Sequence, residues 1–85
     1  MKNELNSLVI IKEYGFVKVK LAEMLDERGI TRNKLSTLIG GKYDVINRYY
    51  KAENITMVDI DLFARICYVL DCNITDLLEY VKNRD

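Results

Sequence analysis

The chain has 85 residues, with 13 basic side chains, 13 acidic side chains and no histidine, so its formal net charge is zero. This length allows one domain with a modest core. The lack of histidine excludes the Ser–His and Cys–His pairs of nucleophilic catalysis, and no glycine-rich phosphate loop follows a strand. We therefore expect no enzyme, no catalytic residue and no cofactor.

The two cysteines, Cys67 and Cys72, lie among apolar residues near the end of one expected helix. We interpret them as small buried hydrophobic residues, because a metal site needs more ligands than these two thiols. No apolar run approaches the roughly 20 residues that span a bilayer, and the N-terminus lacks the small-residue cleavage site of a signal peptide. The sequence therefore favours a cytoplasmic protein without a metal site or membrane contact.

The first 18 residues form an apolar extension, which includes most of the stretch LVIIKEYGFVKVK at residues 8–20. Its β-branched residues and its alternation predict a short strand or β-hairpin with Glu13-Tyr14-Gly15 as the turn. A helix over residues 4–14 is an alternative, because its apolar side chains could share one face. A two-stranded hairpin is marginally stable alone, so we expect this extension to pack on the helices or to contact a second copy of the chain.

Residues 19–85 have the apolar spacing and the capping residues of a helical domain. Gly29 and Gly40 are expected to end helices, and Thr31, Asp59 and Thr75 to begin them. The predicted fold is all-α, with a short N-terminal β element and five helices at residues 20–28, 32–39, 43–51, 60–70 and 76–82. The side chains expected inside are Leu21, Met24, Leu25, Leu35, Leu38, Ile39, Val45, Ile46, Tyr49, Phe63, Ile66, Cys67, Leu70, Leu77, Leu78 and Val81.

Basic side chains are concentrated in the middle of the chain. Residues 28–51 have a net charge of +5, whereas residues 52–85 have a net charge of −4. The basic segment contains two expected helices separated by Gly40-Gly41, which is the form of a helix-turn-helix. A basic patch on this motif indicates contact with a phosphate backbone, and a plainly solvated helix face is the alternative interpretation.

The stretch from Val19 to Tyr80 resembles the Cro/phage-repressor-type (Xre-like) helix-turn-helix regulators, and more narrowly their small single-domain bacterial members. The resemblance is carried by LAEMLDERGITRNKLSTLIG, by KYDVINRYYK and by DIDLFARICYVLDCNITDLLEY. It implies sequence-specific binding of double-stranded DNA by a homodimer that regulates transcription, with residues 43–51 in the major groove and no small-molecule ligand.

The resemblance also implies two sets of DNA contacts by motif position. One set reaches the base edges. The other set binds the sugar-phosphate backbone from the start of the helix at residues 32–39 and from both ends of the helix at residues 43–51. The base-reading residues would be Tyr43, Asp44, Asn47 and Arg48, and the backbone-binding residues would be Thr31, Arg32, Lys42 and Lys51.

The sequence departs from the family at three positions around this motif. Gly41 stands where the family usually has an apolar residue, Lys42 where it often has serine, and Ala52 where it often has glycine. We expect Gly41 to loosen how the helix at residues 43–51 is held. Gly41 and the neutral net charge favour an alternative function, a protein-interaction module such as an antitoxin or adaptor on the same fold.

Overall fold

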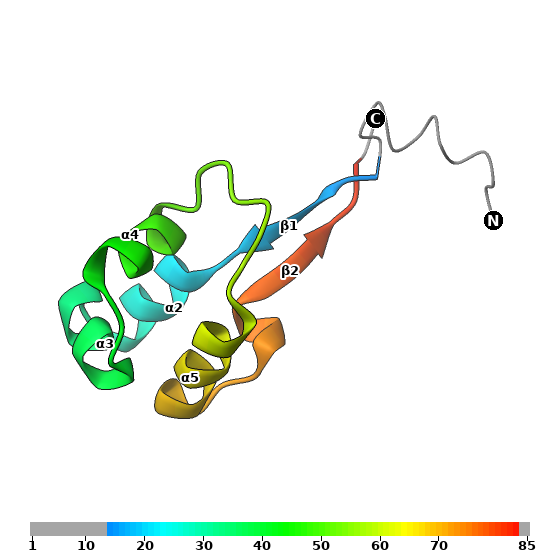
Figure 1. Ribbon diagram of the computed structural model, residues 1–85. Helices are drawn as coiled ribbons and strands as arrows, with labels where there is room; N and C mark the ends of the chain where they lie inside the picture. Colours follow the sequence, from blue (N-terminus) through cyan, green and yellow to red (C-terminus); the bar gives the residue numbers. More distant parts are fainter. Residues whose placement is uncertain (1–13, 84–85) are drawn as a thin grey trace.

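The computed structural model describes residues 14–83. Four α-helices form a compact body, and two short strands extend from it as a ribbon (Figure 1). Residues 1–13 lie outside the described residues. The predicted first strand of a hairpin therefore cannot be compared with the structure, and neither can the alternative helix over residues 4–14, of which only Tyr14 is described. The elements are β1 (Phe16–Val19), α2 (Leu21–Arg28), α3 (Arg32–Ile39), α4 (Tyr43–Lys51), α5 (Ile60–Leu70), the 3-10 turn η1 (Ile74–Asp76) and β2 (Leu78–Val81).

The first four predicted helices are confirmed, and their caps follow the sequence signals. The Thr31 hydroxyl accepts a hydrogen bond from the Lys34 N–H at 3.0 Å, and the Asp59 carboxylate accepts one from the Leu62 N–H at 3.1 Å. Each cap satisfies a first-turn N–H that has no partner within its own helix. Local side-chain chemistry therefore sets where α3 and α5 begin.

The predicted fifth helix is wrong: the described residues are predominantly helical with a short β element, as expected, but they contain four α-helices rather than five. The Leu77 N–H donates to the Ile74 carbonyl at 2.9 Å, which closes one 3-10 turn. The Asn73 N–H donates to the Asp76 carboxylate at 2.8 Å, so Asn73 rather than Thr75 is the cap. The chain then becomes β2, which pairs antiparallel with β1 so that Val19 faces Leu78 and Phe16 faces Val81. A helix here would leave the backbone of β1 without a partner, and unpaired backbone groups are costly.

The core lies where the four helices and the inner end of the sheet meet. Most of the expected inward residues are buried, but Leu38 is 45% exposed. Around the axis of α3, the Leu38 side chain points roughly 80° away from the direction midway between Leu35 and Ile39. The helix therefore buries Leu35 and Ile39 and leaves Leu38 at the edge of the core. Leu62 was not expected inside and is buried.

Tyr49 joins α4 to α5 in the centre of this core. Its ring meets Phe63 edge to face, with 5.1 Å between centroids and 84° between planes. Its hydroxyl accepts a hydrogen bond from the Asp59 N–H at 3.0 Å, so the polar end of this buried ring is satisfied. The same side chain therefore fixes both the depth of α4 in the core and the start of α5.

Both cysteines are free and half-buried. Burial and the neighbouring Cys67 thiol raise the pKa of Cys72 to about 11. At neutral pH Cys72 is therefore a neutral thiol with little nucleophilic thiolate, in agreement with its interpretation as a small hydrophobic residue.

Gly40 and Gly41 have different roles in the turn between α3 and α4. Gly40 has the left-handed φ of +68° and ends α3, whereas Gly41 is not in the left-handed region. The backbone of Gly41 is held twice by Ser36: its N–H donates to the Ser36 carbonyl at 3.0 Å, and its carbonyl accepts from the Ser36 hydroxyl at 2.7 Å. Only Gly40 is therefore required by backbone conformation.

We predict that Gly41→Ala stabilises the fold. A Cβ at Gly41 would lie 3.4 Å from two side-chain carbons of Ile39 and 3.6 Å from Leu62 Cδ1, which is ordinary van der Waals contact. Alanine also reduces the conformational entropy of the unfolded chain, so the expected gain in unfolding free energy is about 0.4–1 kcal/mol by urea denaturation. The matched variant Gly40→Ala should lose about 1–2 kcal/mol. Destabilisation by both variants to the same extent would contradict this assignment of the two glycines.

Candidate nucleic-acid interface

The helices α3 and α4 lie next to each other at one end of the body, joined by the glycine turn (Figure 1). The N-terminus of α3 is capped only by Thr31, and among the described residues no acceptor inside the chain takes the N–H groups of Arg32 and Asn33. Such N–H groups and the helix dipole favour an anion at this point. Lys42 at the start of α4 is exposed and makes no capping hydrogen bond.

The outer face of α4 carries most of the predicted base-reading residues. Ile46 and Tyr49 are buried on the inner face, while Asp44 and Lys51 are exposed on the opposite face and Asn47 is half-buried between them. These three outer residues are spaced by three and four positions, so they form one row along the helix. Tyr43 begins the helix and is 38% exposed.

Arg32 and Asn47 are brought together across the two helices. The Arg32 guanidinium donates to Asn47 Oδ1 at 2.6 Å. Because a guanidinium has no acceptor, the amide oxygen rather than the amide nitrogen must face it. The contact therefore fixes the orientation of the Asn47 amide and leaves its NH₂ group as the free donor.

Tyr50 and Asp26 hold Arg32 in this position, and neither was predicted as a site residue from the sequence. The Arg32 guanidinium carbon lies 4.3 Å from the centroid of the Tyr50 ring, a cation–π contact. The Tyr50 hydroxyl donates to Asp26 Oδ1 at 2.9 Å, and this hydrogen bond is the largest cause of the raised pKa of Tyr50. The chain of contacts runs from α2 through α4 to α3, and such long-range contacts leave no local sequence signal.

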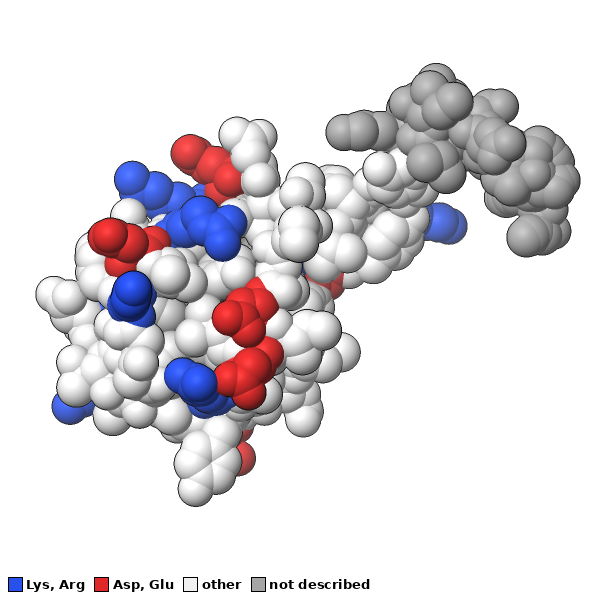
Figure 2. Space-filling model, viewed as in Figure 1, with Lys and Arg blue, Asp and Glu red and all other residues white. Residues whose placement is uncertain are grey.

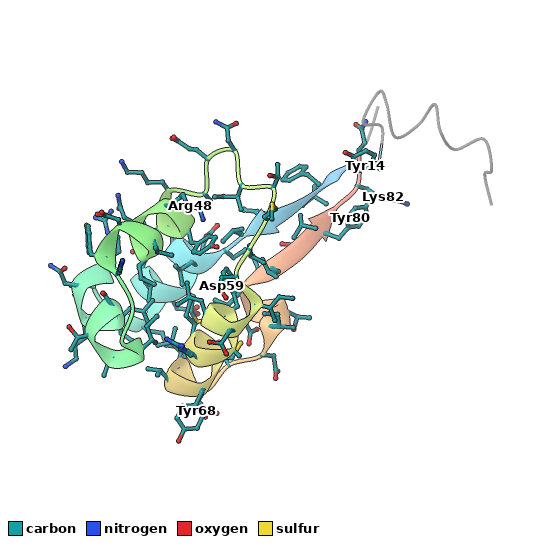
Figure 3. The ribbon with its side chains drawn as sticks, in the orientation of Figure 1. Tyr14, Arg48, Asp59, Tyr68, Tyr80 and Lys82 are labelled. Carbon is teal, nitrogen blue, oxygen red and sulfur yellow. The ribbon has the colours of Figure 1, made fainter. Side chains whose placement is uncertain are left out.

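Arg48 leans away from the centre of the row. Its guanidinium carbon lies 4.8 Å from the centroid of the Tyr49 ring, and its Nη2 is 3.4 Å from the Tyr49 hydroxyl. The side chain nevertheless remains exposed on the outer part of α4 (Figure 3). Arg48 is therefore at the edge of this face.

The charge of this face is mixed. Figure 2 shows basic side chains gathered at the upper left, over α4, with carboxylates close beside them. Lys42, Arg48 and Lys51 are exposed, whereas Arg32 is half-buried. Arg28, which contributes to the positive charge of the middle segment, instead donates a hydrogen bond to the Leu70 carbonyl at the end of α5. The net charge of the segment thus overstates the positive charge of the face itself.

Within residues 14–83, no three His, Cys, Asp or Glu side chains are grouped so that they could hold a metal ion. None of the helices in this part of the chain has the length and apolar character needed to cross a membrane.

Comparison with known proteins agrees with this geometry. The family model of the Cro/C1-type HTH DNA-binding domain matches residues 20–83. The crystal structure of transcriptional regulator VanUg, Form II, is similar with a TM-score of 0.61 and 25% sequence identity, over 80% of this chain and 89% of that chain. No curated protein is significantly similar to this chain in sequence. Since the family match covers most of the chain, including α2, α3, α4, α5 and β2, the chain belongs to the Cro/C1-type helix-turn-helix DNA-binding family.

Proposed function

We propose that the protein is a transcriptional regulator that binds double-stranded DNA sequence-specifically through α4 in the major groove. The observation that carries this proposal is the row of Asp44, Asn47 and Lys51 on the outer face of a helix whose inner face is fixed in the core. A major groove admits one α-helix, and polar side chains at this spacing reach base edges. The transcriptional regulator VanUg has a similar fold, which supports the same activity here.

Asn47 is the strongest candidate for reading a base. Its amide is oriented by Arg32, so its NH₂ group is presented outward to an acceptor such as guanine N7 or O6 or thymine O4. The second lone pair of Oδ1 is still free to accept. Tyr43, Asp44 and Arg48 flank it, and Asp44 can accept only from a donor such as the cytosine amino group.

The backbone contacts in this proposal come from both ends of the motif. Thr31 and Arg32 lie at the N-terminus of α3, where free N–H groups favour a phosphate. Lys42 and Lys51 lie at the two ends of α4 and are exposed, so each can reach a phosphate without breaking an internal contact. Such contacts fix the register of the protein on the duplex but carry no sequence information.

A homodimer on a two-fold site is part of this proposal. The nine residues of α4 span only about 13 Å, so one copy reads few base pairs. Two copies on half-sites about one helical turn apart, roughly 34 Å, would double the sequence that is read. In this proposal residues 1–18 are an N-terminal extension of the helix-turn-helix domain at residues 19–85.

We predict that the protein binds duplex DNA with an affinity that falls steeply with salt, because bound lysines and arginines release counterions. In fluorescence anisotropy across a salt series, Lys51→Ala should reduce the slope of log K against log salt by about one. The matched control is Lys82→Ala, a lysine directly after β2 and far from α4 (Figure 3), which should leave the slope unchanged. No binding at about 50 mM salt would contradict the proposal and point to the protein-interaction module on this fold.

We also predict that Arg32 and Asn47 act as a unit in DNA binding. In a double-mutant cycle of Arg32→Ala and Asn47→Ala, the loss of binding free energy in the double variant should differ from the sum of the two single losses by at least about 0.5 kcal/mol, because Arg32 orients the Asn47 amide. The cycle of Arg32→Ala with Lys42→Ala is the control and should be additive to within about 0.5 kcal/mol. Additivity in both cycles would mean that Arg32 only contacts phosphate.

A further inference from the structure

An apolar groove lies between the sheet and the α4–α5 connection. It has a volume of about 1040 Å³ and is bordered by β1, by part of α2, by residues 50–52 at the end of α4 and by residues 54–58. One end of the groove therefore adjoins the face proposed for DNA, at Lys51. Val17 and Met57 line it and are 52% and 79% exposed. Large apolar side chains on opposite walls of one groove mark a surface that excludes water when it is occupied.

One wall of the groove is an edge of β1 that no strand within residues 14–83 pairs with. In this part of the chain the sheet has two strands, with β2 on one side of β1. The Lys20 N–H donates to the Leu77 carbonyl, and donors alternate sides along an antiparallel strand. Val17 and Val19 therefore direct their N–H and C=O groups to the free edge, which is a template for another strand.

We propose that this groove is the docking site of the chain's own residues 8–12, LVIIK, which add a third strand to the free edge of β1. These residues have the β-branched composition of a strand and lie three to seven positions before Gly15. Both Tyr14 and Gly15 line the groove, so the preceding chain starts at its end. Gly15 has a φ of +86°, a conformation that allows the chain to change direction on entering β1.

Length and tethering favour this occupant over a second copy of the chain. The groove follows β1 for about five residues, roughly 17 Å, whereas the 13 residues before Tyr14 can span about 40 Å. A segment tethered next to its site has an effective concentration of the order of millimolar. A second molecule must reach a similar concentration in solution before it competes for the same edge.

The test is hydrogen–deuterium exchange of the full chain, followed by mass spectrometry at two protein concentrations tenfold apart. We expect the amides of residues 8–12 to exchange at least tenfold more slowly than an unstructured peptide, equally at both concentrations. Met57→Glu places a charge in the groove and should abolish this protection. The matched control is Tyr68→Glu, which changes an 87% exposed aromatic residue on α5 on the far side of the body from the sheet (Figure 3).

Exchange of residues 8–12 at the unstructured rate would overturn the proposal. Protection that grows with concentration, together with a dimer in sedimentation, would also overturn it and assign the groove to a second copy. Equal loss of protection in Met57→Glu and Tyr68→Glu would show that the protection does not depend on the groove. DNA is absent from each measurement, so these outcomes are independent of the proposed function.

Discussion

The position of α4 depends on Tyr49 more than on any other side chain. A helix can present a row of polar residues reliably only if its inner face is fixed, and Tyr49 fixes it at two points, the Phe63 ring and the Asp59 N–H. The contact with Asp59 also ties α4 to the start of α5, across a connection of eight residues that lacks regular structure. Because Arg48 stacks on the outer side of the same ring, the core and the proposed DNA-binding face share one aromatic side chain.

The parts of the fold that the sequence predicts are those decided by neighbours in the chain. Thr31, Gly40 and Asp59 mark helix ends through hydrogen bonds and backbone conformations that span only a few residues. The part it mispredicts, residues 76–82, is decided by a partner far away in the sequence. The LLEYV stretch has apolar residues that suit a helix or a strand, and the free backbone of β1 favours the strand.

The same distinction applies to the proposed site. The spacing of Asp44, Asn47 and Lys51 is a local pattern, and their common outer face follows from the helix alone. The orientation of the Asn47 amide is not local, because it depends on Arg32 from α3 and, through Tyr50, on Asp26 from α2. Sequence spacing therefore identifies which residues face outward, while their hydrogen-bonding directions require the packed structure.

The neutral net charge of the chain is compatible with DNA binding because the charges are unevenly distributed along the sequence. Acidic residues are concentrated in residues 52–85, whereas the free N–H groups of α3 and the lysines at the two ends of α4 belong to the basic segment at residues 28–51. At physiological salt, charges farther apart than about 8 Å are largely screened, so the local composition of a face matters more than the total. The mixed face of this protein, with Asp44 among the basic residues, should then attract phosphate less strongly than its basic residues alone would, so that base contacts add to its affinity. Such a balance favours discrimination between sequences over tight non-specific binding, because removing backbone attraction weakens binding to all sequences alike.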